Sequence, residues 1–193
     1  MGRKLIIGMK SDYFYYFFAA FIFVRFFLSG IVLTVHTIIV FSTPLIYIIY
    51  NKHYHIFKFD INDTVQSVLF DFLFGALMLI VIVFGSIYSG SFNWVNIFEI
   101  PTSMILLLAM LSINYELLIR YFFGGFFEKK FGTIIGIAVS SLIGGLIFLP
   151  DLLSAASFFV CGLFFGYIFS KTNDIYGPSL GGFIIRLAIA GLA

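Results

Sequence analysis

Long apolar stretches, separated by short polar breaks, run along almost the whole chain. Five of them approach the length that an α-helix needs to cross the hydrocarbon core of a bilayer, about 20 residues. They are residues 64–88, 101–120, 133–149, 152–170 and 177–193. The intervening segments 89–99, 124–132, 150–151 and 171–176 are polar or rich in turn-forming residues. The pattern predicts an all-α fold, a polytopic bundle of transmembrane helices.

The first apolar stretch, residues 13–50, is too long for one ordinary span and short for two. A turn at Ser29–Gly30 divides it into two helices and gives seven spans, whereas a single helix gives six. Seven spans satisfy the positive-inside rule better, because they place the cationic loops on one side and leave Glu99 and Asp151 on the other. The cations concerned are Arg3, Lys4, Lys10, Lys52, Lys58, Arg120, Lys129, Lys130 and Lys171. We therefore predict six to seven spans, favour seven, and place the N-terminus in the cytoplasm.

Composition excludes a soluble domain. Of the 193 residues, 62% are hydrophobic and 10% are charged, whereas a soluble domain carries about 25% charged residues. The net charge of +2 gives no basic patch for nucleic acid. Most of the molecular surface must therefore face lipid or other membrane proteins, so we expect an integral membrane protein. We place it in a prokaryotic cell membrane as an expectation separate from the composition.

A few ionisable residues fall within the apolar stretches, where such groups usually face the bundle interior and pair with each other. They are Arg25, His36, Asp71, Glu116, Arg120 and Arg186. Arg120 follows Glu116 by four positions, on the same helix face. Arg186 lies near the middle of the last span, where an unpaired arginine costs at least ~2.5–3.5 kcal/mol. We predict that Arg186 pairs with Glu116 or, as second choice, with Asp71; the alternative is that it reaches lipid headgroups.

Small residues recur at four-residue spacing in the C-terminal half, which predicts close helix packing there. The pairs are Gly132/Gly136, Gly162/Gly166 and Gly177/Gly181, with Gly144–Gly145 nearby. His53 and His55 lie in a polar segment between spans. Two histidines two positions apart are a weak metal signal, and a solvated juxtamembrane loop is the preferred interpretation. No metal or cofactor is expected.

Four ordered runs in the second part of the chain carry a family resemblance. They are 115–120 (Tyr-Glu-Leu-Leu-Ile-Arg), 126–132, 140–148 (Ser-Ser-Leu-Ile-Gly-Gly-Leu-Ile-Phe) and 177–186 (Gly-Pro-Ser-Leu-Gly-Gly-Phe-Ile-Ile-Arg). Together they resemble the membrane-bound CAAX protease and bacteriocin-processing (Abi) family, whose pattern is Glu-Glu-xxx-Arg, Phe-xxx-His and His-xxx-Asn or Asp on successive motif helices. The resemblance implies a domain at 60–193, preceded by an N-terminal membrane hairpin and juxtamembrane loop at 1–59.

The family's catalytic residues carry over only in part. Glu116 and Arg120 match the first motif, but its first glutamate is Tyr115. The phenylalanine and histidine of the second motif correspond to Gly144 and Phe148, and the last motif becomes Gly182 and Arg186. The family uses glutamates and histidines to activate a water molecule, so the resemblance implies a degenerate member without catalytic activity. It also implies a subunit or scaffold role, with other integral membrane proteins and membrane lipids as partners.

Two other functions remain open. A residual intramembrane protease could be built on Glu116 as a lone general base. A small transporter or channel component could use Asp71, Glu116 and Arg186 to line a path. The chain shows no inverted repeat with matched broken helices, which argues against the transporter.

Overall fold

The computed structural model describes residues 13–88, 100–149 and 151–190, and all regular secondary structure within these ranges is helical. The predicted all-α class is confirmed. The elements are α1 (Tyr13–Phe23), η1 (Val24–Phe27), α2 (Gly30–Tyr50), η2 (Tyr54–Phe57), α3 (Ile61–Tyr88), α4 (Thr102–Glu116), η4 (Leu117–Gly124), α5 (Gly125–Phe131), α6 (Thr133–Leu146), α7 (Leu152–Thr172) and α8 (Tyr176–Ala190).

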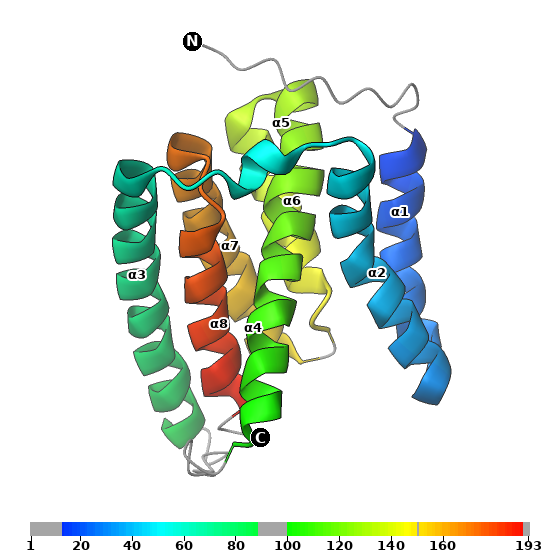
Figure 1. Ribbon diagram of the computed structural model, residues 1–193. Helices are drawn as coiled ribbons and strands as arrows, with labels where there is room; N and C mark the ends of the chain where they lie inside the picture. Colours follow the sequence, from blue (N-terminus) through cyan, green and yellow to red (C-terminus); the bar gives the residue numbers. More distant parts are fainter. Residues whose placement is uncertain (1–12, 89–99, 150, 191–193) are drawn as a thin grey trace.

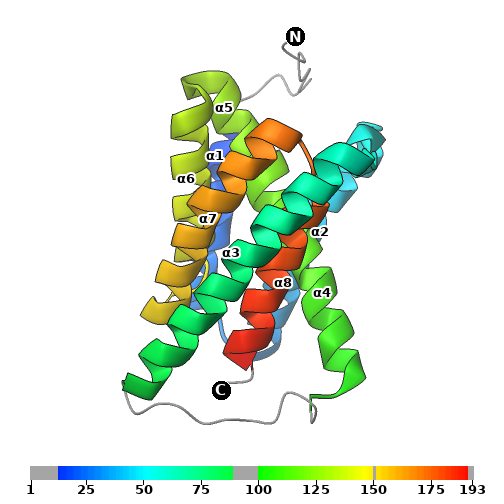
Figure 2. The same ribbon diagram turned by 90° about the vertical axis from the view of Figure 1, so that its left-hand side faces the viewer.

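The helices form an up-and-down bundle in which α4, η4 and α5 make one continuous central rod (Figure 1). The α1–α2 hairpin lies on one side of this rod, while α3 and α8 lie on the other (Figure 1). Turned by a quarter, the molecule shows α3 crossing in front of α7 and α8, which both contact it (Figure 2). The central rod carries the first motif and contacts both α6 and α8, which carry the other two.

Among the residues that the structure describes, four helices are long and apolar enough to cross a membrane: Gly30–Tyr50, Ile61–Gly85, Thr102–Phe131 and Leu152–Thr172. The chain is therefore an integral membrane protein with four apolar helices of spanning length. The other described rods, α1 with η1, α6 and α8, are shorter. Six or seven spans stay a prediction.

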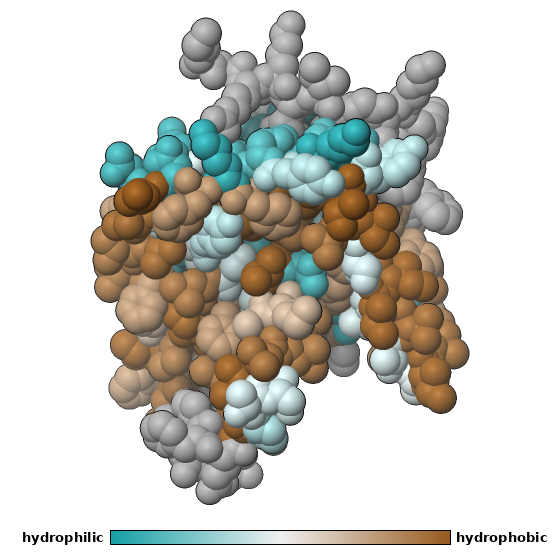
Figure 3. Space-filling model, viewed as in Figure 1, coloured by the Kyte–Doolittle hydropathy of each residue, from teal (hydrophilic) through white to brown (hydrophobic). Residues whose placement is uncertain are grey.

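Polar residues gather in a band at one end of the bundle (Figure 3). Lys52 and Lys58 lie in the connection at that end, Lys129 and Lys130 in α5, and Lys171 in the last turn of α7. Asp151 caps the start of α7 at the opposite end (Figure 1). This distribution agrees with the positive-inside argument. Arg3, Lys4, Lys10 and Glu99, which were also used in that argument, lie outside the described residues.

The predicted turn at Ser29–Gly30 is present, and it divides residues 13–50 into two antiparallel helices. Gly30 has a φ of +55°, a conformation that glycine adopts without steric cost. The Nε2 atom of His36 lies 2.8 Å from the carbonyl oxygen of Phe21, which joins the two helices across the hairpin. The intramembrane histidine therefore holds the hairpin together.

The predicted polar break at 124–132 is wrong in most of its length. The helix continues through Gly124 and Gly125, both of which have helical φ and ψ angles, and ends at Gly132 with a φ of +89°. A side chain added at Gly132 meets no atom within 4 Å, so this glycine serves the turn and not the close packing we predicted. Exposed Lys129 and Lys130 lie in the last turn, where cations interact favourably with the helix dipole.

The central part of the rod is a π-helix, η4, whose first seven residues are all buried. It contacts α2, α4, α5, α6 and α7. Aromatic rings join it and α5 to the hairpin: Tyr15 stacks on Phe126 at 4.1 Å between ring centroids, and Phe18 packs edge-on against Phe122 at 5.5 Å. Wide π turns occur frequently at functional sites, and this one begins directly after Glu116.

Glycines let the C-terminal helices approach closely. A Cβ atom at Gly162 of α7 would lie 2.8 Å from the Cβ of Ser141 in α6, and one at Gly145 of α6 would lie 2.7 Å from the carbonyl oxygen of Ala155. Between α3 and α8, a Cβ at Gly75 would lie 3.3 Å from the Cα of Gly181. The small-residue spacing thus marks real helix contacts.

Substitution of Gly162 by alanine should destabilise the bundle by about 1–3 kcal/mol, because the added methyl group forces α6 and α7 apart. Gly85→Ala is the matched control, since its Cβ would meet no atom within 4 Å. Thermal unfolding of the purified protein in detergent should show a lower midpoint for Gly162→Ala and an unchanged or higher one for Gly85→Ala. Equal midpoints for the two variants would contradict the packing described.

Candidate functional site

The residues at the family's motif positions lie close together in the middle of the bundle. Tyr115 and Glu116 end α4, Phe148 follows α6, and Gly182 and Arg186 lie on α8. A Cβ at Gly144 would meet the hydroxyl oxygen of Tyr115, and one at Gly182 would lie 3.4 Å from Oε1 of Glu116. Three separate stretches of the chain therefore converge on one site.

Glu116 and Arg120 form a buried ion pair. The Nε atom of Arg120 donates to Oε2 of Glu116 at 2.9 Å, and the two residues are 2% and 1% exposed. The Nη1 atom of Arg120 lies 3.3 Å from the hydroxyl oxygen of Ser141 in α6. Glu116 ends α4 and Arg120 lies in η4, so the pair spans the junction of the two elements. Both side chains lie on the face of the rod that meets α6, α7 and α8.

Two glycines make room for the ion pair. A Cβ at Gly166 of α7 would lie 3.4 Å from Nη1 of Arg120, and Gly182 stands at the same distance from the Glu116 carboxylate. The neighbouring helices therefore approach the charged side chains closely. The packed helices keep bulk water away from the pair. The attraction between the two charges is therefore stronger, because the surroundings have a low dielectric constant.

Three aromatic rings close the site toward the end of α6. Phe148 and Phe158 stack with ring centroids 3.9 Å apart and planes 9° apart. Tyr115 lies 5.7 Å from Phe148 and 5.4 Å from Phe158, in tilted or edge-on contact with each. We name Tyr115, Phe148 and Phe158 the aromatic box.

Arg186 projects into the aromatic box. Its guanidinium carbon lies 4.7 Å from the ring centroid of Tyr115, 4.8 Å from that of Phe158 and 5.2 Å from that of Phe148, all within cation–π range. The predicted partner Glu116 is close enough to interact electrostatically, but its salt bridge is with Arg120. Nε and Nη2 of Arg186 are buried and have no hydrogen-bond partner among the described residues. Cation–π contacts therefore stand where we predicted an ion pair.

Asp71, the second predicted partner of Arg186, lies at a different level of the bundle. It is fully buried in α3 and its Oδ2 accepts a hydrogen bond from Ser67 at 3.2 Å. A Cβ at Gly177 would lie 2.7 Å from the same oxygen. Gly177 precedes Arg186 by nine residues, or about 13 Å along an α-helix. Asp71 thus serves the contact between α3 and the start of α8.

The histidines lie away from the ion pair. His36 belongs to the N-terminal hairpin. Nδ1 of His53 lies 2.5 Å from the hydroxyl oxygen of Tyr121, so the segment predicted to be a solvated loop is docked on η4 at this residue. His55 is exposed. Within the described ranges no group of three or more His, Cys, Asp or Glu side chains could hold a metal ion.

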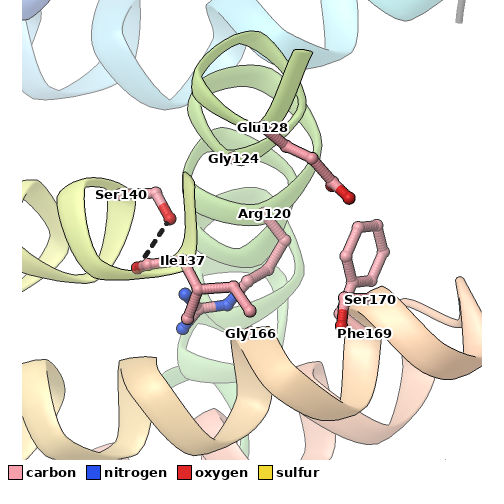
Figure 4. A pocket seen from close by; sticks show the side chains of 8 residues that line it. All are labelled: Arg120, Gly124, Glu128, Ile137, Ser140, Gly166, Phe169 and Ser170. Atoms are coloured by element: carbon pink, nitrogen blue, oxygen red, sulfur yellow. Dashed lines mark hydrogen bonds between the residues drawn. The ribbon is translucent and has the colours of Figure 1, made fainter. Parts of the chain in front are cut away.

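A small recess lies beside Arg120 (Figure 4). It has room for about one water molecule. The guanidinium of Arg120 lies between Ile137 and Gly166, and the Glu128 side chain extends on the other side, toward Phe169 (Figure 4). Its lining is completed by Gly124, Ser140 and Ser170. The recess is large enough to hydrate Arg120 but too small to admit a peptide.

Sequence reasoning missed three participants in the site. Ser141 accepts a hydrogen bond from Arg120, although no feature of its sequence position marked it as a partner. Phe158 was one of 28 phenylalanines and had no signal to distinguish it, since only the fold brings it over Arg186. Tyr121 had no sequence partner because His53 is 68 positions away.

A buried charge that loses its partner costs several kcal/mol. Double-mutant cycles can therefore test which residues are paired. Glu116→Met and Arg120→Met should each destabilise the protein by about 3–5 kcal/mol, and the double variant should lose much less than the sum. Glu116→Met and Arg186→Met should couple more weakly, because no salt bridge joins Glu116 to Arg186. Unfolding free energies in detergent for the two cycles measure the coupling. A larger coupling for Glu116 with Arg186 would contradict the assigned pairing.

Part of the chain is similar to a known protein family. No curated protein and no solved structure matches the chain. One family model, described as type II CAAX prenyl endopeptidase Rce1-like, matches residues 98–186. The matched stretch begins within the first half of the predicted 60–193 domain and includes α4, η4, α5, α6, α7 and most of α8. The match thus identifies residues 98–186 as an Rce1-like domain of the CAAX prenyl endopeptidase (Abi) family.

Proposed function

We propose that this protein is a non-catalytic member of the family, a pseudoprotease that acts as a subunit or scaffold of a membrane protein complex. The observation that supports it is the content of the converged site. Of the side chains at the motif positions, Glu116 alone can accept a proton as a carboxylate, and Arg120 binds it at 2.9 Å. The positions that the resemblance assigns to the family's first glutamate and two histidines hold Tyr115, Phe148 and Gly182.

Water activation needs a base that can take up a proton at the reacting atom. In this site the Nε–H of Arg120 already occupies Oε2 of Glu116 at 2.9 Å, so that oxygen is not free to take a proton from water. Arg186 adds a second positive charge within electrostatic reach of Glu116. Phe148 cannot share a proton, since its side chain is a hydrocarbon. The site therefore favours a stable interior over proton transfer.

The surface supports the subunit role. Large hydrophobic side chains are exposed along α2, α3 and α4, with Ile31 at 83%, Phe84 at 67% and Met110 at 64%. With short connections between the described helices, most of the area available for contact lies within the bilayer. We propose seven spans with the N-terminus in the cytoplasm of a prokaryotic cell, and partners among other integral membrane proteins and lipids.

Residual proteolysis by Glu116 is the second candidate, and the family match at residues 98–186 favours it. Cleavage of a fluorogenic prenylated CAAX peptide by the purified protein in vesicles distinguishes the two. We expect no cleavage above vesicles alone, and Glu116→Gln should leave that background unchanged. Cleavage that disappears in a folded Glu116→Gln variant would show that the protein is a protease and would contradict the proposed pseudoprotease.

A subunit should remain with its partner when the membrane is dissolved gently. Extracted from its native membrane in a mild detergent, the tagged protein should elute as a complex larger than the 21.8 kDa chain with bound detergent. A second membrane protein should be present at a fixed molar ratio over repeated purifications. The same protein produced in a foreign host serves as the control. Elution of the native preparation as a monomer without a constant companion would contradict the subunit role.

A further inference from the structure

Arg186 is a membrane-embedded cation whose hydrogen-bonding capacity is unused. Its guanidinium carries five N–H donors and no acceptor. The three rings of the aromatic box attract the charge but offer no carboxylate or carbonyl oxygen in the plane of the guanidinium. Nε and Nη2 are buried without a hydrogen-bond partner among the described residues. A buried donor without an acceptor is costly, particularly on a charged group.

The nearby acids of the described chain do not supply the acceptor. Glu116 is held by Arg120 at 2.9 Å, and Asp71 lies beside Gly177 on the other part of α8. The phosphate of a lipid headgroup is also remote. Arg186 is ten residues beyond Tyr176, about 15 Å along the helix, which is about half of the 30 Å hydrocarbon core.

Part of the site is accessible from outside the bundle. Arg186 as a whole is only partly buried, and so is Phe148 of the aromatic box. The far half of the hairpin presents exposed Val32 and Val35, at 59% and 50%. A helix from another protein can therefore contact apolar surface while its side chain reaches toward the interior.

We infer that Arg186 and the aromatic box form an intramembrane binding site for the carboxylate of an acidic residue in a partner's transmembrane helix. The inference rests on the proposed function and names the chemistry of the partner. A guanidinium binds a carboxylate through two parallel hydrogen bonds. Pairing also neutralises the partner's own costly intramembrane acid, so the two buried charges specify each other. The apolar rings exclude water and thereby strengthen the pair.

Model transmembrane peptides test this inference. The full-length protein, with a donor fluorophore on a terminal tag, is reconstituted in phosphatidylcholine vesicles. Three acceptor-labelled Leu/Ala peptides of about 23 residues carry Glu at the centre, Gln at the centre, or Glu near one end. Energy transfer against peptide mole fraction gives the association constants. The central-Glu peptide should bind about tenfold more tightly than the central-Gln peptide, and the end-Glu peptide should resemble Gln.

Variants assign the preference to Arg186. Arg186→Met should abolish the preference for Glu over Gln, whereas Arg25→Met, which removes an arginine remote in sequence from the site, should retain it. Arg186→Lys should keep part of it, since the charge remains but the bidentate geometry is lost. Thermal unfolding of each variant checks the fold, and Arg186→Lys serves if Arg186→Met does not fold.

Several results would overturn the inference. One is equal binding of the Glu and Gln peptides by the unaltered protein, and another is an undiminished preference in folded Arg186→Met. Arg186-dependent binding of oleate without any peptide preference would assign the site to a lipid carboxylate instead. If the unaltered protein shows no preference for the Glu peptide and Glu99→Gln does, the carboxylate that binds Arg186 belongs to this chain and not to a partner. Failure of the proposed function is separate, because it is detected as peptide cleavage and not as loss of this preference.

Discussion

The ion pair between Glu116 and Arg120 sets the conditions under which the rest of the bundle can pack. Two charges that are almost completely inaccessible in a membrane protein must be paired, since either alone would carry a large desolvation cost. Their pairing at 2.9 Å leaves a compact polar unit that neighbouring helices can surround. Gly166 and Gly182 are the points of closest approach, and Ser141 accepts the remaining contact of Arg120. The close packing of α6, α7 and α8 on the central rod therefore follows the shape of this pair.

The second cation of the interior is treated differently. Arg120 has a carboxylate and a hydroxyl group, whereas Arg186 has three aromatic rings. Cation–π attraction is worth less than a buried ion pair and leaves the N–H donors free. One arginine thus completes the structure of the chain, while the other retains capacity for a further interaction. Tyr115 and Phe148 of the box, and Arg186 itself, stand at positions that the resemblance assigns to polar residues of the family motif, whereas Phe158 does not.

The π-helix η4 links this site to the N-terminal hairpin. Phe122 within η4 packs edge-on against both Phe18 of α1 and Tyr47 of α2, and Tyr121 bonds His53 in the connection that follows. The hairpin therefore rests on the same rod that carries Glu116 and Arg120. A wide helical turn rotates successive side chains relative to an α-helix, so η4 presents aromatic residues to the hairpin and Arg120 to the opposite face.

Hydrophobic pattern and composition alone determined that the chain is helical and lies in a membrane, because backbone groups in lipid must be satisfied within each helix. They also located the turn at Ser29–Gly30 and the glycines that mark close contacts, since both depend on local residue size and conformation. The four-residue spacing of Glu116 and Arg120 placed them on one face in advance. Tertiary structure alone decided which of the two arginines takes the carboxylate, because both are within electrostatic reach of Glu116 and only the packing of α8 determines their distances. It also decided that Phe158, Phe148 and Tyr115 surround Arg186, since ring contacts between residues this far apart in sequence have no periodic signature.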